Sequence, residues 1–298
     1  MAPLYLSRFE QSCVRIAQLT GPLIAKGPDG YDCAHGTAFL IGDRLAVTAA
    51  HVITGYLQHV HGIELLSDGF QPRRRGSRIE LDFVLLLPNT DLGQVQFEVV
   101  RTTVFTPGDI ALLELGNAKN YPWQNLAPYP SLRIAGPRLG EWVLALGYPT
   151  TRVRRKNLSR VLLATSLTGA DGLVTEVTHQ SSDPHSRRFP RFQTNASYRG
   201  GMSGSPIVGE DGCVCGVVAS SLESDLEEDT VSFGSILWPL ARAKATCRQK
   251  HRASTRKPRS IIHSKIVHVA DFDALPEPIL NLAIPHPETQ GSPDSADA

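Results

Sequence analysis

Short apolar or alternating runs recur along the chain between turn-forming residues, and this pattern predicts antiparallel β-structure. In the first half the runs are CVRIAQL, GTAFLIG, RLAVTA, IELDFVLLL, VQFEVVRTTVF and IALLEL. In the second half they are EWVLALGY, RVLLATSL, GLVTEVT, RFQTNAS, SPIVGE, CVCGVVAS and VSFGSIL. Many short strands separated by turns are typical of an all-β protein built as a sandwich or as barrels.

Four prolines within residues 121–138 mark a linker between the two sets of strands. The chain therefore divides into an N-terminal set over residues 10–120 and a C-terminal set over residues 139–250. Within the second set, WPLARAKATCRQK (residues 238–250) predicts an amphipathic helix with Pro239 in its first turn, where a missing N–H is tolerated.

Residues 251–298 differ in composition from the rest of the chain and predict a partly disordered tail. The end, PETQGSPDSADA, is polar and rich in residues typical of disorder. Between this end and a basic segment lies IIHSKIVHVADFDALPEPILNLAI, residues 261–284. This apolar stretch is expected to dock on a surface, either of the chain itself or of a regulatory partner.

Composition limits the function classes. A formal net charge of +1 over 298 residues gives no reason to expect a nucleic-acid or membrane partner. No apolar run reaches the roughly 18 residues that span a bilayer, and the N-terminus lacks the pattern of a secretory signal. The five cysteines are an odd, sparse set rather than a disulfide framework. We therefore expect a reducing, cytoplasmic location.

Three segments contain, in the order His, Asp, Ser, the residues that acyl transfer needs. They are GTAFLIGDRLAVTAAHVI with His51, GDIALLEL with Asp109, and GGMSGSPIVGEDGCVCGVVAS with Ser203. A serine hydroxyl needs a base such as His, and the imidazole needs a carboxylate that holds its tautomer. Asp82 and Asp91 are competing acids.

The tetrahedral intermediate of acyl transfer also needs donors for its oxyanion. Backbone N–H groups supply them best where glycine allows a tight turn. The segment Gly200–Gly204 has this composition, and it predicts an oxyanion hole formed by the N–H groups of Gly201 and Ser203.

These segments resemble the chymotrypsin-like (trypsin-type) serine peptidases, most closely the bacterial HtrA-type and V8-type members. TAAH is similar to the histidine motif, DIALLEL to the aspartate motif, and GGMSGSP to the V8-type serine motif. The resemblance covers about residues 10–250. It implies two six-stranded antiparallel β-barrels, a catalytic triad of His51, Asp109 and Ser203, a protein or peptide substrate, and no cofactor or metal. The tail is too short for the PDZ domain of HtrA-type members.

The resemblance also places the primary specificity pocket. Its floor would be Ser197, and its walls Ala219, Ser220 and Ser221, whose backbone would pair with the substrate. These residues carry no charge, so we expect small or medium uncharged side chains at the scissile bond. A carboxylate from the acidic stretch 223–229 would favour basic side chains instead if it entered the pocket.

Two other functions compete. An α/β-hydrolase esterase would need G-x-S-x-G, but Ser205 occupies the last glycine position and the chain order is wrong. A catalytically inactive, protease-like binding module would need a collapsed oxyanion turn or a blocked cleft.

A metal site at Cys33 and His35 lacks partners at a suitable spacing. The basic runs 73–75 and 152–156 are interpreted as solvated loops.

Overall fold

The computed structural model describes residues 6–27, 30–61, 83–89, 93–105, 108–116, 128–157, 160–178, 190–222, 231–245, 259–262 and 267–271. The basic run 73–75, the acids Asp82 and Asp91, the acidic stretch 223–229 and the end of the tail lie outside the described residues.

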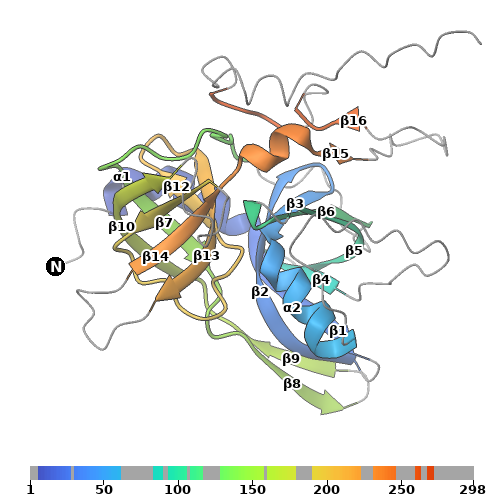
Figure 1. Ribbon diagram of the computed structural model, residues 1–298. Helices are drawn as coiled ribbons and strands as arrows, with labels where there is room; N and C mark the ends of the chain where they lie inside the picture. Colours follow the sequence, from blue (N-terminus) through green and yellow to red (C-terminus); the bar gives the residue numbers. More distant parts are fainter. Residues whose placement is uncertain are drawn as a thin grey trace, which may run out of the picture.

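Twelve strands form two closed antiparallel barrels, which confirms the expected all-β fold (Figure 1). The first barrel has the order β1-β2-β3-β6-β5-β4. Its strands are β1 (Thr20–Gly27), β2 (Gly30–Gly42), β3 (Leu45–Ala49), β4 (Phe83–Asn89), β5 (Gly93–Phe105) and β6 (Ile110–Leu115). The second barrel has the order β10-β11-β14-β13-β12-β7. Its strands are β7 (Trp142–Gly147), β10 (Thr168–Thr178), β11 (Arg191–Thr194), β12 (Pro206–Gly209), β13 (Val214–Leu222) and β14 (Val231–Ile236).

The first predicted strand, CVRIAQL (residues 13–19), is wrong. Residues 13–18 form the last part of a helix, α1 (Leu6–Gln18). Phe9 and Ile16 are buried seven positions apart, whereas Val14 is 61% exposed. This is the spacing of one helical face, which a short alternating run cannot reveal. The strand that takes its place in the barrel is β1. It was not predicted because Gly21 and Pro22, near its start, are residues typical of turns.

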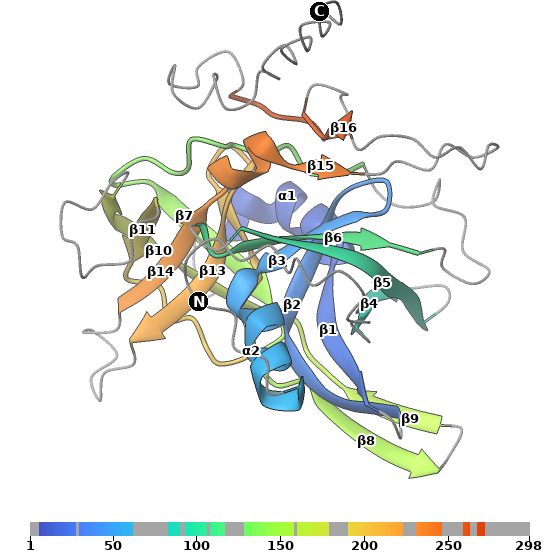
Figure 2. The same ribbon diagram turned by 45° about the vertical axis from the view of Figure 1, so that its right-hand side comes forward.

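A second helix, α2 (Ala50–His61), follows β3 directly and was not expected from the pattern. The run RVLLATSL forms β9 (Arg160–Ala164), which pairs with β8 (Arg152–Asn157) in a hairpin outside both barrels. Figures 1 and 2 show this hairpin beside the lower end of β2. The basic run 152–156 therefore lies in a strand, not in the predicted loop.

The amphipathic helix predicted over residues 238–250 is also wrong for residues 238–245, the part that the structure describes. A single 3₁₀ turn, η4 (Trp238–Arg242), ends at Ala243, whose ψ of 136° is extended. The chain then enters β15 (Lys244–Ala245), which pairs with β16 (Arg259–Ser260). Pairing with the tail thus ends the helix, a long-range contact that no local pattern reports.

The tail docks where the apolar stretch predicted a contact. Ile261, Ile262 and Val267 are buried in the same core cluster as Leu132 of the linker. Leu132 N–H donates to the carbonyl of His268 at 2.9 Å. The N–H of Ala270 donates to the Leu132 carbonyl at 2.8 Å. The backbone of the tail at Val269 thus pairs in parallel with the linker at Leu132.

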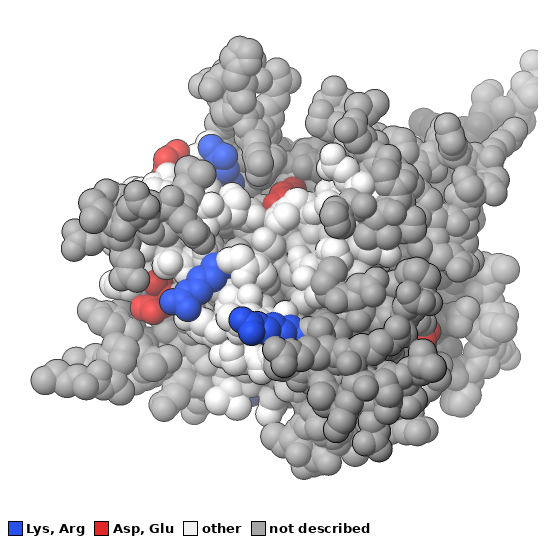
Figure 3. Space-filling model, turned by 90° about the horizontal axis from the view of Figure 1, so that it is seen from below, with Lys and Arg blue, Asp and Glu red and all other residues white. Residues whose placement is uncertain are grey.

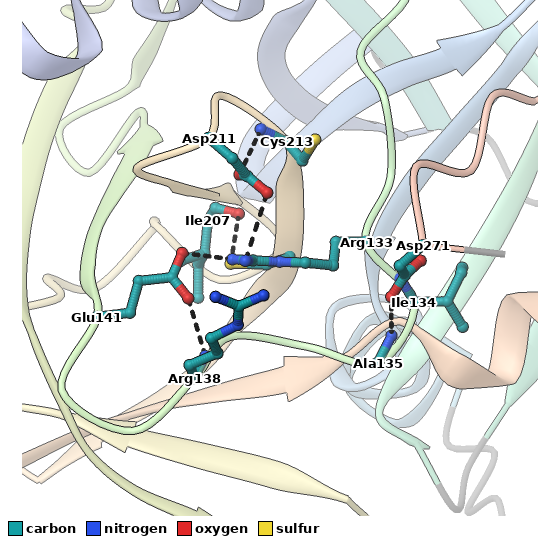
Figure 4. A network of polar contacts seen from close by, with 10 residues as sticks. Arg133, Ile134, Ala135, Arg138, Glu141, Ile207, Asp211, Cys213 and Asp271 are labelled. Carbon is teal, nitrogen blue, oxygen red and sulfur yellow. Dashed lines mark hydrogen bonds and ion pairs between the residues drawn. The ribbon is translucent and has the colours of Figure 1, made fainter. Parts of the chain in front are cut away.

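Charged side chains hold residues 133–135 of the linker (Figure 4). Arg133 is largely buried and pairs with Glu141 at 2.5 Å and with Asp211 at 3.3 Å. Asp271 of the tail accepts hydrogen bonds from the N–H groups of Ile134 at 2.9 Å and Ala135 at 2.8 Å. The linker is thus tied both to the β12–β13 turn and to the tail.

Neither helix in the described part of the chain combines the length and the apolar character needed to cross a bilayer.

Asp271→Ala should lower the free energy of unfolding by about 1–3 kcal/mol, because two backbone N–H groups lose their acceptor. Urea unfolding followed by tryptophan fluorescence measures this change. Asp171→Ala, at an exposed position of β10, is the matched control and should shift stability by less than about 0.5 kcal/mol. Equal effects of the two substitutions would show that the tail contact contributes nothing.

Tyr198→Phe should preserve or raise stability near pH 7, because the buried Tyr198 hydroxyl has no hydrogen-bond partner among the described residues. Burial raises the pKa of Tyr198 above its ordinary value. Above about pH 10 the unfolded phenol therefore loses its proton while the folded one keeps it, and stability falls by up to about 1.4 kcal/mol per pH unit. Urea unfolding between pH 7 and 11 should show a shallower decline for the Phe variant. Parallel curves would contradict this.

Candidate active site

His51 is the second residue of α2, at the point where the fully buried strand β3 ends. Ala50 N–H donates to the backbone carbonyl of Asp109 at 3.0 Å, and His51 N–H donates to Asp109 Oδ1 at 2.9 Å. These two bonds bind the start of the helix to the residue before β6. The imidazole is 44% exposed, so it faces solvent while its backbone is fixed.

Asp109 lies next to His51 because β3 and β6 pair with Ala49 opposite Ile110. Its φ of 47° is left-handed, a conformation that Asp tolerates better than most residues. The preceding Gly108 has no room for a side chain, since a Cβ there would lie 2.2 Å from the ring of Pro239. The backbone therefore turns tightly at residues 108–109 and directs the carboxylate towards α2.

The Asp109 carboxylate holds the imidazole in one orientation. Nδ1 of His51 lies 3.1 Å from Oδ1 and 3.0 Å from Oδ2, and the carboxylate is only 9% exposed. An ionised carboxylate only accepts hydrogen bonds, so Nδ1 must carry the proton. In the neutral imidazole the other ring nitrogen, Nε2, is then unprotonated and able to act as a base.

Ser203 lies after a tight turn that connects β11 to β12. Met202 N–H donates to the Arg199 carbonyl at 3.0 Å, and Gly201 has a φ of +89°. A positive φ at the third residue, with a negative one before it, defines a type II turn. Types I and II differ by a rotation of the central peptide, here Gly200–Gly201, so the turn type decides where the Gly201 N–H points. Neither this N–H nor that of Ser203 has an acceptor among the described residues.

Two glycines allow the Ser203 turn to approach the first barrel. A Cβ on Gly36 would lie 2.7 Å from the Ser203 carbonyl oxygen and 2.8 Å from Val52, the residue after His51. A Cβ on Gly204 would lie 2.1 Å from the Thr37 carbonyl, and its φ is +87°. The structure thus brings all three predicted triad residues to the junction of the two barrels.

The three residues are not all hydrogen-bonded to one another. His51 and Asp109 are in direct contact, whereas no hydrogen bond joins Ser203 Oγ to the imidazole within the part of the chain that the structure describes. Ser203 is half-buried and His51 is exposed, so both are open to a substrate.

The residues predicted for the specificity pocket lie on both sides of β14. Ala219 is buried at a bulge in the β13–β14 ladder, Ser220 and Ser221 are half-buried, and Ser197 is exposed. Sequence reasoning missed Ser232, whose hydroxyl accepts from Tyr198 N–H at 3.2 Å and lies 3.0 Å from Ser221 Oγ. No local motif could have identified it, because its partners come from other strands.

Thr37 is a second residue that sequence reasoning missed. Its hydroxyl lies 3.0 Å from the Gly201 carbonyl, and its N–H donates to the Ser203 carbonyl at 2.8 Å. The only signal was its position in GTAFLIG, upstream of the His51 segment.

His35 packs edge-on against Tyr56, with 5.2 Å between ring centroids. No group of three His, Cys, Asp or Glu side chains in the described ranges could hold a metal ion. On the face seen in Figure 3, the described Lys and Arg side chains are few and stand among mostly uncharged ones. The two antiparallel barrels are incompatible with the parallel sheet of an α/β-hydrolase, so the esterase alternative is excluded.

Comparisons with known proteins identify a family and a fold. A family model described as "Trypsin-like peptidase domain" matches residues 36–217. No curated protein sequence matches the chain significantly. The crystal structure of Deg5 superimposes with a TM-score of 0.50 at 16% identity, covering 80% of this chain and 93% of Deg5. The HtrA-type protease AlgW, solved with a tripeptide, gives a TM-score of 0.50 at 16% identity, covering 76% of this chain and 59% of AlgW. At these identities the solved structures are evidence for the fold alone.

Proposed function

Because the chain belongs to the trypsin-like peptidase family, we propose that it is a serine endopeptidase that cleaves peptide bonds through an acyl-enzyme on Ser203. The observation that carries this proposal is the His51–Asp109 contact beside a type II turn, in which the N–H groups of Gly201 and Ser203 have no acceptor among the described residues.

In the proposed reaction, Ser203 Oγ attacks the carbonyl carbon of the scissile bond while His51 Nε2 accepts the hydroxyl proton. Asp109 stays ionised and stabilises the imidazolium. The N–H groups of Gly201 and Ser203 donate to the oxyanion. The imidazolium then gives its proton to the leaving amine, and the acyl-enzyme forms. Water, deprotonated by His51, hydrolyses the ester and restores Ser203.

The edge of β13 is the place where we expect a peptide substrate to bind. Strand β12 pairs with β13 only as far as Val217, and Gly204 N–H binds the Val218 carbonyl. Beyond that point, Ala219–Ser221 have β14 on one side and no strand on the other among the described residues. An extended substrate could add there as a further strand, with its scissile bond next to Ser203.

The second candidate is a catalytically inactive, protease-like binding module. The missing hydrogen bond between Ser203 and His51 favours it. Catalytic hydrogen bonds are often long without substrate and shorten in the complex, so this geometry is compatible with both functions.

Two further features belong to the proposal. We propose a reducing, cytoplasmic location, because Cys13, Cys213 and Cys215 are free thiols. We also propose that the tail, residues 251–298, offers a site for a regulatory partner, since its apolar stretch continues beyond the docked residues.

Ser203→Ala and His51→Ala should each lower turnover of a peptide substrate by about 10⁴-fold or more, because each removes a group that acts only in the transition state. Asp109→Asn should be nearly as severe, since it favours the wrong tautomer. Labelling by a fluorophosphonate probe, with Ser203→Ala as the control, measures the reactive serine directly. Proteolysis that survives in Ser203→Ala would refute the assignment. A wild type that folds but neither labels nor cleaves would support the binding module.

Cleavage of a peptide library should favour small or medium uncharged side chains before the scissile bond, because the described residues around the pocket are serines and Ala219. A profile dominated by Arg and Lys would contradict this. It would mean that a carboxylate from residues 223–229 enters the pocket.

Activation should not require a new N-terminus. In the zymogens of this family a freed ammonium pairs with an Asp beside the nucleophile, but here Met202 occupies that position and is fully buried in an apolar cluster with Tyr198. A buried, unpaired ammonium would be costly. The chain with an uncleavable N-terminal fusion should therefore label with a fluorophosphonate as fast as the unfused chain. Labelling that appears only after removal of the fusion would refute this.

A further inference from the structure

We infer that Thr37 is a positioning residue of the active site, which holds the oxyanion turn of the second barrel from a strand of the first. The inference rests on the proposed function, since it assigns to Thr37 an effect on turnover at Ser203. Thr37 lies in β2 and is completely buried. It contacts the turn through both its backbone and its side chain.

The two bonds that Thr37 donates reach the carbonyls of the two oxyanion residues. Its N–H binds the Ser203 carbonyl at 2.8 Å, and its Oγ1 binds the Gly201 carbonyl at 3.0 Å. The N–H groups of these same residues are the proposed donors to the oxyanion. One residue of the first barrel thus fixes the backbone on both sides of Met202.

The backbone carbonyl of Thr37 is bound as well, although its neighbour in the sheet cannot donate to it. Its partner in the β1–β2 register is Pro22, which has no N–H to donate. The Thr37 carbonyl accepts instead from Thr48 Oγ1 at 2.7 Å. Thr37 Oγ1 also accepts from Tyr148 N–H at 3.2 Å. The Thr37 hydroxyl therefore donates its single proton to the Gly201 carbonyl. The bond that it accepts from Tyr148 N–H fixes the orientation of the hydroxyl.

These contacts select the conformation of the turn. Glycine adopts positive and negative φ with similar ease, so Gly201 has little intrinsic preference for the type II turn. The peptide between Gly201 and Met202 is held at both ends, by Thr37 at its carbonyl and by the Arg199 carbonyl at its N–H. Loss of the Thr37 hydroxyl would free one end and leave the Gly201 carbonyl and Tyr148 N–H without a partner. The Gly200–Gly201 peptide could then rotate and withdraw the Gly201 N–H from the oxyanion.

Thr37→Val removes the hydroxyl and keeps the shape of the side chain, whereas Thr37→Ser keeps the hydroxyl. Loss of one oxyanion donor lowers kcat by about 10²–10³-fold in other enzymes. Because rotation of the turn would be partial, we expect Thr37→Val to lower kcat by about 10- to 100-fold with KM changed by less than about threefold. Thr37→Ser should restore kcat to within about threefold of the wild type.

The matched control is Thr20→Val, which removes another buried threonine hydroxyl of the first barrel, bonded to the Ile16 carbonyl at 2.7 Å. It should leave kcat unchanged. Equal losses of kcat in Thr37→Val and Thr20→Val, or a change confined to KM, would overturn the inference. If Thr37→Val fails to fold, Thr37→Ala against Thr37→Ser provides the same comparison.

Crystal structures of the Val and Ser variants separate this inference from the proposed function. The Val variant should lose the positive φ of Gly201 or show two orientations of the Gly200–Gly201 peptide, and the Ser variant should keep the type II turn. An unchanged turn in the Val variant would overturn the positioning role even if the wild type is an active peptidase. A wild type that never labels at Ser203 would instead refute the peptidase assignment, and the two structures would still decide what holds the turn.

Discussion

The candidate active site depends on the contact between strand β2 of the first barrel and the Gly201–Ser203 turn of the second. His51 and Asp109 belong to one closed barrel and Ser203 to the other, and no pairing of barrel strands joins the two barrels among the described residues. The hydrogen bonds across the junction must therefore come from irregular backbone and from side chains. Thr37 supplies two of them, one through its backbone N–H and one through its hydroxyl.

The close approach of neighbouring segments leaves no room for a side chain at several positions, which are occupied by glycine. Gly36, Gly108 and Gly204 each lie where a Cβ would come within 3 Å of an atom from another segment. Two of these contacts join the barrels directly, and the third sets the turn that directs Asp109 towards His51. The geometry of the site is thus determined largely by backbone packing, and the three side chains of the candidate triad are placed as a consequence.

The linker and the tail are held in a different way. The linker lies between the start of β13 and the tail, and it is tied to them by Arg133 and Asp271. Backbone pairing of Leu132 with residues 268–270 adds to these contacts. Since the linker joins the two barrels, the tail is part of their common framework over residues 259–262 and 267–271.

The sequence alone determined the class of fold and the residues of the candidate triad, because alternating strands and short motifs around His51, Asp109 and Ser203 are local signals. It could not decide between helix and strand for residues 13–19, where one short run suits both periods, and it did not show that pairing with the tail ends the helix at Arg242. The roles of Thr37 and Ser232 were also invisible, since their partners come from distant segments. Thr37 and Gly201 are 164 residues apart, and only the folded chain brings that hydroxyl to that carbonyl.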